Sequence, residues 1–218
     1  MSARRAALFD LDRTLVRRET ASLYVRHMRA TGQATWRDSL QIAWWVAQYT
    51  VGVIDAPRVA AQAMSTYRGL PEVALAARCD DWVRNDVVPH IGDEARRAVR
   101  RHRERGDVTA IVTGASPYAA WPVARLLGIE HVVASEFEIV DHRLTGRPAL
   151  PLCYGEGKVE RASKLATEQG FRLDEACFYT DSYTDMPLLL AVAEPIVVNP
   201  DLRLAREARR RGWPVERW

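Results

Sequence analysis

The sequence predicts an α/β protein in which a parallel sheet carries helices on both faces and an all-helical insertion follows the first strand. After residue 87, short apolar runs alternate with helical patterns, as they do where helices connect the parallel strands of one sheet. From residue 18 to residue 86, only helical spacing occurs. In a chain of 218 residues, we therefore expect a core domain of residues 1–17 and 87–218 and a helical cap domain of residues 18–86.

The predicted elements follow in chain order. The run from Ala6 to Phe9 is apolar, short and ends at a polar break, which predicts a buried strand. In the insertion, helical spacing and cap signals such as Asp55 ahead of Pro57 predict helices at 20–31, 35–49, 55–69 and 70–86. Later strands are predicted at 108–114, 131–135, 176–181 and 195–199, with a hairpin at 137–147. Helices are predicted at 92–106, 118–128, 157–170 and 185–193, and a last one before residue 212.

Composition and charge narrow the class of protein. Lys and Arg number 31 against 28 Asp and Glu, and basic runs such as ARRAVRRHRER are typical of solvated helix faces rather than of a nucleic-acid interface. Three cysteines without a CxxC pattern favour a reduced, cytoplasmic compartment, and we expect no signal peptide. The uncharged residues 39–54 are shorter than the ~20 residues of a membrane span, so we expect a helix there, with Trp44 and Trp45 open to contact with substrate or a partner.

Polar residues end three of the predicted strands. The first predicted strand ends at Asp10, the second at Thr113 and a later one at Asp181. In such sheets ligands bind outside the carboxyl ends of the strands, so we expect these residues to meet at one edge. The helical insertion leaves the core shortly after Asp10, and there it could cover the edge as a lid that excludes water.

Acidic residues would converge at this edge, namely Asp10, Asp12, Asp181 and Asp185. Their mutual repulsion indicates a hard divalent cation, and in the absence of a His or Cys cluster in the sequence the preferred ion is Mg²⁺. A bound phosphate would also need positive and hydrogen-bonding partners. The Thr113 hydroxyl, the Gly114 backbone and Lys158 at the start of a predicted helix are the candidates.

The motifs DLDRT, VTGAS, Lys158 in GEGK, and DSYTD, in this order, resemble those of haloacid-dehalogenase-superfamily phosphatases. The resemblance covers essentially the whole chain and is strongest to the phosphoserine-phosphatase-like subgroup (subfamily IB), which carries a helical cap after the first motif. It implies a Rossmann-like core and a Mg²⁺-dependent phosphomonoester hydrolase acting on a small metabolite. One departure is Thr180, which stands where many relatives have glycine and which bears on the local loop geometry.

The resemblance implies a role for each site residue. Asp10 would take the phosphoryl group as an aspartyl phosphate, and Asp12 would protonate the leaving oxygen and then activate water. Asp10, the backbone carbonyl of Asp12 and Asp181 would hold Mg²⁺, with Asp185 assisting directly or through water. Thr113, Gly114 and Lys158 would hold the phosphate. By itself, Asp185 could instead cap the helix that follows it.

Substrate choice is expected to lie in the cap and its linker. Glu19 matches a family position that contacts the amino group of the substrate, although it could instead cap a helix at Thr20. In the family, an arginine of the cap pairs with the substrate carboxylate, and Arg58 or Arg68 could match it here. Arg13 is either a further basic group at the site or a solvent-facing loop residue. O-phosphoserine and histidinol phosphate are both open, with O-phosphoserine preferred, and sugar phosphates are expected to react weakly.

Rival functions stay open at this point. A phosphotransferase would pass the phosphoryl group to a second substrate instead of water. A phosphate-binding regulatory protein would keep the fold without turnover, although every catalytic position is present here. A dehalogenase is disfavoured, because that chemistry does without the carboxylates that Asp181 and Asp185 supply. The oligomeric state is not indicated by any pattern.

Overall fold

The computed structural model describes residues 5–32 and 56–218 and contains one six-stranded parallel sheet. Its strands lie in the order β3-β2-β1-β6-β7-β8. Their bounds are β1 Ala6–Phe9, β2 Val108–Val112, β3 His131–Val133, β6 Cys177–Thr180, β7 Glu194–Val198 and β8 Val215–Glu216. All of the pairings in this sheet are parallel, so the carboxyl ends of its strands share one edge, as the alternation of strands and helices predicted.

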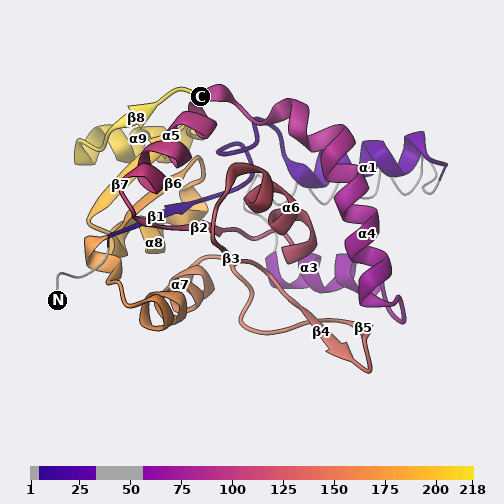
Figure 1. The fold of residues 1–218 in the computed structure, drawn as a ribbon. Helices are drawn as coiled ribbons and strands as arrows, with labels where there is room; N and C mark the ends of the chain where they lie inside the picture. The colour runs from indigo at the N-terminus through magenta and orange to yellow at the C-terminus, as the bar shows by residue number, and fades with distance from the viewer. Residues whose placement is uncertain (1–4, 33–55) are drawn as a thin grey trace.

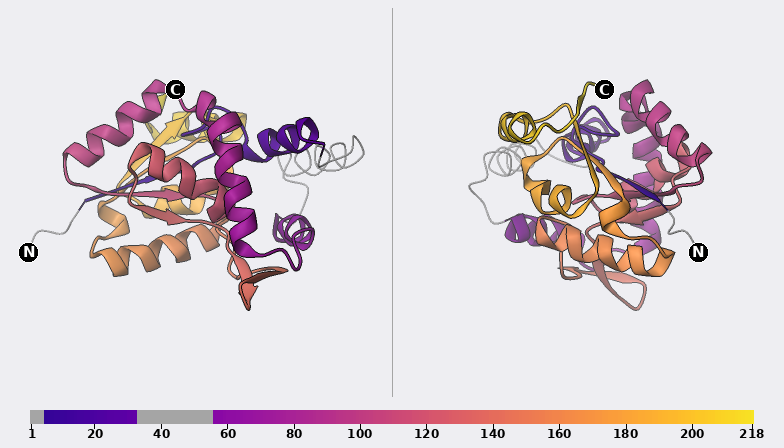
Figure 2. Two further views of the ribbon diagram at one scale, coloured as in Figure 1. Left: turned by 45° about the vertical axis from the view of Figure 1, so that its right-hand side comes forward. Right: turned by 90° about the vertical axis from the view of Figure 1, so that its left-hand side faces the viewer.

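Helices cover both faces of the sheet (Figures 1 and 2). One face packs against α5 Asp93–Glu104 and α6 Pro117–Leu127, and the other against α7 Glu156–Gln169, α8 Met186–Ala191 and α9 Leu202–Arg211. Because β1 lies at the centre and is covered on both sides, all four of its residues are buried, which explains its continuous apolar run. The predicted α/β core is therefore confirmed.

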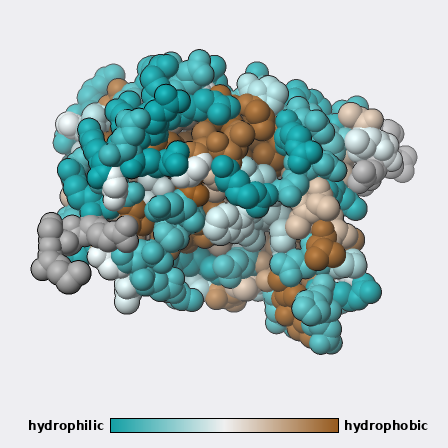
Figure 3. All heavy atoms as spheres, viewed as in Figure 1, coloured by the Kyte–Doolittle hydropathy of each residue, from teal (hydrophilic) through white to brown (hydrophobic). Residues whose placement is uncertain are grey.

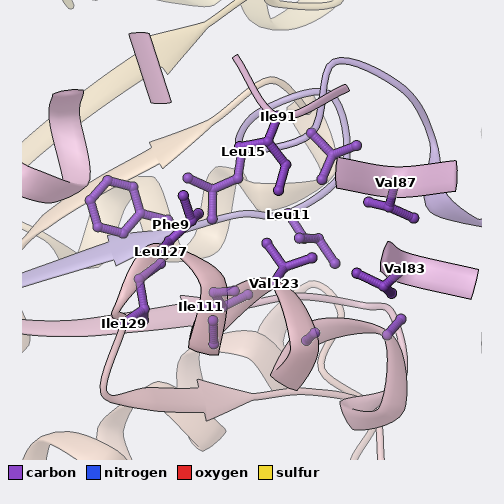
Figure 4. Close-up of a cluster of buried hydrophobic side chains, with 14 of the residues drawn as sticks. Phe9, Leu11, Leu15, Val83, Val87, Ile91, Ile111, Val123, Leu127 and Ile129 are labelled. Carbon is purple, nitrogen blue, oxygen red and sulfur yellow. The ribbon is translucent and has the colours of Figure 1, made fainter. Parts of the chain in front are cut away.

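The segment after β1 is tied into the core by apolar side chains. Leu11 and Leu15 are fully buried and pack with Val83 and Val87 from the end of the insertion and with Ile91 (Figure 4). The backbone closes a tight loop through a hydrogen bond from Val16 N–H to Leu11 O at 2.9 Å. Leu11 and Leu15 therefore anchor this segment in the core, and the polar residues between them lie near the sheet edge.

The described part of the insertion is helical and lies beyond the carboxyl end of β1 (Figures 1 and 2). It comprises α1 Thr20–Ala30, α3 Ala56–Ser65 and α4 Glu72–Trp82, followed by a π-helical turn, Val83–Val87, and a 3₁₀ turn, Val88–His90. The helix predicted at 35–49, with Trp44 and Trp45, lies outside the described residues. None of the described helices has the length and apolar character to cross a bilayer.

A β-hairpin projects from the core beside the cap (Figure 1). Its strands are β4 Phe137–Val140 and β5 Arg143–Pro148, as predicted, and Asp141 and His142 form the turn with φ of 48° and 59°. Backbone hydrogen bonds from Gly69 N–H to Leu144 O and from Glu72 N–H to His142 O join the hairpin to the cap. Apolar side chains are exposed on the surface of the hairpin. The rest of the hairpin surface is largely hydrophilic in the view of Figure 3.

Many element boundaries differ from the prediction by one to four residues, and three differences stand out. The strand expected to reach residue 135 ends at Val133, and the short edge strand β8 was not predicted. The helix expected at 70–86 is α-helical only to Trp82, after which the π-helical turn follows. These differences arise at element ends, where hydrogen bonds to neighbouring segments decide the backbone and local sequence pattern is weakest.

Candidate active site

The loop after β1 brings Asp10 to the middle of the sheet edge. Asp10 donates its backbone N–H to the carbonyl oxygen of Tyr179 in β6 at 2.8 Å, and its side chain is buried. Two residues after Tyr179, Asp181 leaves the carboxyl end of the neighbouring strand and is also buried. The two carboxylates thus lie side by side because β1 and β6 are paired in parallel, as the sequence predicted.

Lys158 joins the carboxylates from the first turn of α7. Its Nζ lies 2.8 Å from Oδ1 of Asp10 and 2.7 Å from Oδ2 of Asp185, and all three side chains are almost fully buried. The loop before α7 depends on glycine. A Cβ at Gly157 would lie 2.1 Å from the carbonyl oxygen of Leu152, and Gly155 has a φ of 54° with a ψ of −126°, which is open mainly to glycine.

Thr180, the departure from the family pattern, holds Asp185 in place. Its hydroxyl donates to Oδ2 of Asp185 at 2.6 Å and accepts the N–H of Ser182 at 3.2 Å. Asp185 is positioned as the N-cap of α8, but its side chain makes no capping hydrogen bond there and instead binds Lys158 and Thr180. The capping interpretation of Asp185 is therefore wrong, and Thr180 is a site residue that sequence analysis missed.

Asp12 contacts the cap rather than the core. Its Oδ1 accepts the backbone N–H of Thr20, the first residue of α1, at 2.6 Å. Free N–H groups and the positive end of the helix dipole both favour a carboxylate at this place. Glu19 is the N-cap residue of α1, but its side chain makes no capping hydrogen bond and contacts only Ser22 Oγ, at 3.4 Å, among the described residues.

The phosphate-binding candidates on the second strand lie at the same edge of the sheet. Thr113 is buried directly after β2, and its Oγ1 accepts the N–H of Ala115 at 3.1 Å. Gly114 is exposed beside it, and a Cβ there would meet only the Cys153 carbonyl oxygen, at 3.6 Å. Within the described structure, no hydrogen bond joins either residue to the carboxylates, so both lie at this edge outside the ion-pair network.

The three arginines considered for substrate choice lie in different parts of the structure. Arg13 lies at the site, with Nε 3.2 Å from Oδ2 of Asp181. Arg58 belongs to α3, but its side chain lies outside the described residues. Arg68 is exposed, and its Cβ packs close to Gly146 of the hairpin. Arg13 thus lies at the site as a basic group paired with a buried carboxylate, while its side chain also stays 40% exposed in the loop.

The comparisons with known proteins identify the family. A sequence model of haloacid dehalogenase-like hydrolases matches residues 7–190. The chain belongs to this family. The hydrolase is 32% identical to a phosphoserine phosphatase of Mycobacterium tuberculosis over 96% of this chain and 70% of that protein. It is 29% identical to a histidinol-phosphatase of Neisseria meningitidis over 96% of both chains. A crystal structure of a Bordetella pertussis protein of unknown function matches with a TM-score of 0.86 at 32% identity, over 98% of both chains.

Burial and crowding shape the electrostatics of the hydrolase site. Burial raises the pKa of Asp10 from 3.8 to about 7, and Asp185 and Asp12 add to this effect while Lys158 opposes it. Burial and the Asp10 charge raise the pKa of Asp181 to about 9, with Arg13 opposing. Burial lowers the pKa of Lys158, but Asp10 and Asp185 more than offset this, so its pKa is raised and it stays charged. The site thus contains more negative charge than its own cations neutralise.

The donor set fits a hard cation. Among the described residues, charged partners reach only one oxygen of Asp10 and one of Asp181, which leaves each carboxylate an oxygen for a metal. No group of three Asp, Glu, His or Cys side chains in the described part of the chain forms a ready-made metal cage. Mg²⁺ does not need one, because one or two carboxylates, waters and substrate phosphate usually complete its octahedral shell.

Proposed function

We propose that this hydrolase is a Mg²⁺-dependent phosphomonoesterase that forms an aspartyl phosphate on Asp10. The observation that carries the proposal is the buried ion pair of Lys158 with Asp10 at the carboxyl edge of the sheet, 2.8 Å apart. A carboxylate attacks a phosphate dianion only where the repulsion between them is screened, and Lys158 is placed to screen both. The phosphatase names of the two relatives support the same reaction class.

The proposed reaction has two displacements. In the first, a carboxylate oxygen of Asp10 forms a bond to phosphorus while the bond to the leaving oxygen breaks, and Asp12 gives that oxygen a proton. In the second, Asp12 takes a proton from water, whose oxygen attacks phosphorus and releases Asp10. Burial raises the pKa of Asp12 while its hydrogen bonds with Thr20 oppose this, so it is suited to hold a proton in one step and release it in the other.

Asp10, the carbonyl oxygen of Asp12 and Asp181 are proposed to hold Mg²⁺, with Asp185 acting directly or through a water. The bound ion would supply positive charge to the transferring phosphoryl oxygens. Thr113, the Gly114 backbone and Lys158 would bind the remaining phosphate oxygens. The contacts of Asp185 with Lys158 and Thr180 support a role in orienting Lys158, beside any role toward the metal.

The proposed substrate is a small cytoplasmic phosphomonoester with an amino group, O-phosphoserine being preferred and histidinol phosphate the alternative. Glu19 supports this choice, because it directly precedes Thr20, the residue whose backbone N–H binds Asp12. A cationic amine next to the scissile phosphate would be stabilised there. The names of the relatives do not separate the two substrates.

Release of inorganic phosphate tests the proposal. The purified protein with Mg²⁺ is expected to hydrolyse p-nitrophenyl phosphate, and O-phosphoserine or histidinol phosphate with higher kcat/KM. Asp10→Asn, which keeps the shape of the side chain, is expected to lower kcat by at least about 10³. Turnover without free phosphate would indicate a phosphotransferase. Binding of phosphate without turnover would indicate a regulatory protein, and parental activity in Asp10→Asn would exclude the aspartyl phosphate.

A further inference from the structure

Arg13 occupies an unusual backbone conformation at the centre of the site. Its φ of 57° lies in the left-handed region, which costs a non-glycine residue roughly 1 kcal/mol or more. The conformation turns the side chain back to the sheet edge, where Nε lies 3.2 Å from Oδ2 of Asp181. The Arg13 side chain remains 40% exposed, whereas that of Asp181 is 8% exposed. An exposed cation thus reaches inward to a buried carboxylate at the cost of backbone strain.

Different positive or hydrogen-bonding groups bind the different carboxylates of the site. Lys158 binds Asp10 and Asp185, and the N-terminus of α1 binds Asp12. Within the described residues, Asp181 has Arg13 as its only ion-pair partner. Because an arginine keeps its charge at any working pH, Arg13 offers Asp181 a positive partner at every pH unless the side chain moves away.

We propose that Arg13 is a built-in counter-ion that competes with Mg²⁺ for Asp181 and thereby weakens metal affinity. The inference rests on the proposed function, because it takes Asp181 as a metal ligand. In the metal-free protein, Arg13 lowers the repulsion between Asp181 and Asp10 and so stabilises the fold. When the cation binds, the Arg13 side chain can leave Asp181 and move into solvent, which its partial exposure permits. Alternatively, Arg13 stays at Asp181 and repels the cation. Both outcomes lower the affinity of the site for Mg²⁺.

Mg²⁺ binding to the metal-free protein, measured by calorimetry without substrate, tests this inference. Arg13→Gln is expected to bind Mg²⁺ roughly three- to tenfold more tightly than the parent, the size expected for a partly screened charge. The same variant, metal-free, is expected to unfold at a lower temperature than the parent. Arg13→Lys keeps a charge and is expected to remain closer to the parent. Arg18→Gln removes one positive charge from the same segment and is expected to leave the affinity unchanged.

Several results would overturn the role of Arg13. Unchanged or weaker Mg²⁺ binding by Arg13→Gln would exclude competition between Arg13 and Mg²⁺ for Asp181. An equal gain in Mg²⁺ affinity in Arg18→Gln would also exclude it, because the gain would then reflect net charge alone. A higher KM for substrate at unchanged Mg²⁺ affinity would make Arg13 a substrate contact instead. Arg13→Gly also lacks the charge, and glycine adopts this φ without strain, so it supplies the affinity measurement if Arg13→Gln folds poorly.

The two proposals can fail separately. Calorimetry of the parent and the variants does not depend on turnover, so a protein that binds Mg²⁺ but hydrolyses no phosphomonoester would refute the proposed function and leave the affinity ratio to decide the role of Arg13. A protein that hydrolyses phosphomonoesters but shows no gain in Mg²⁺ affinity in Arg13→Gln or Arg13→Gly would refute only the proposed role of Arg13 as a counter-ion that competes with Mg²⁺.

Discussion

Lys158 and Asp10 form a buried ion pair, with Nζ 2.8 Å from Oδ1, although they lie 148 residues apart in the chain. The pair links the first strand to the first turn of α7 and includes Asp185 through the second contact of Lys158. Taking such charges out of water is costly, and the arrangement is stable only while every partner is present. The ion pair therefore connects the stability of the fold to the chemistry proposed for the site.

Lys158→Met is expected to destabilise the protein by about 3–5 kcal/mol at a pH near 8, because it leaves two buried carboxylates without their cation. The loss should shrink toward acidic pH, where Asp10, whose pKa burial raises to about 7, can take up a proton instead. Urea denaturation at both pH values measures the effect. Lys164→Met on the same helix is the matched control, since Lys164 is exposed and, among the described residues, forms only a long surface pair with Glu168. Equal stability of the two variants would contradict the prediction.

The metal-free protein is expected to lose stability as pH rises. Burial raises the pKa of Asp10 to about 7 and that of Asp181 to about 9, from an ordinary 3.8. Between pH 3.8 and about 9, Asp10 and Asp181 therefore hold more protons in the folded protein than in the unfolded chain, so their contribution to the free energy of unfolding falls with rising pH across that window. The unfolding temperature in EDTA is expected to drop by roughly 5 °C or more from pH 5 to pH 8.

Added Mg²⁺ is expected to reverse this loss, with a larger rise in unfolding temperature near pH 8 than near pH 5, because the carboxylates must be ionised to bind it. Asp181→Asn should flatten the pH profile in EDTA and reduce the gain from Mg²⁺. A profile that rises with pH in EDTA would show that the buried carboxylates are ionised without cost.

Thr180→Val keeps the shape of a buried side chain but removes the hydroxyl that binds Asp185. We expect a loss of about 1–3 kcal/mol in stability and a fall of about 10–100-fold in kcat, since Asp185 and with it Lys158 would lose orientation. Thr180→Ser retains the hydroxyl and is expected to recover most of the activity. Activity in Thr180→Val equal to that in Thr180→Ser would make the threonine a packing residue only.

Glu19→Gln is expected to raise KM for O-phosphoserine and histidinol phosphate by about 10–100-fold, the cost of removing a charged hydrogen-bond partner of an amine. Hydrolysis of p-nitrophenyl phosphate, which has no amine, should be nearly unchanged and serves as the internal control. Steady-state kinetics on the three substrates provide the comparison. An equal loss on all three would place Glu19 in the support of Asp12 or of α1 instead of in substrate choice.

Sequence patterns predicted the sheet, the described cap helices and the convergence of Asp10 and Asp181, because buried parallel strands are continuous apolar runs and their ends share one edge. The role of Thr180 could not be predicted in this way. A threonine before a loop is common, and only the position of Asp185, within 2.6 Å of its hydroxyl, reveals the contact.

By itself, the sequence determined which residue types occur at the strand ends, and therefore that carboxylates, a threonine and a lysine would share one edge. Only the tertiary structure decided the pairing of charges, with Lys158 on Asp10 and Asp185, the N-terminus of α1 on Asp12, and Arg13 on Asp181. The physical reason is that the positions of strands and helices along the chain follow from local periodicity. The choice of ion partner depends instead on burial and on distances of a few ångströms between segments far apart in the chain.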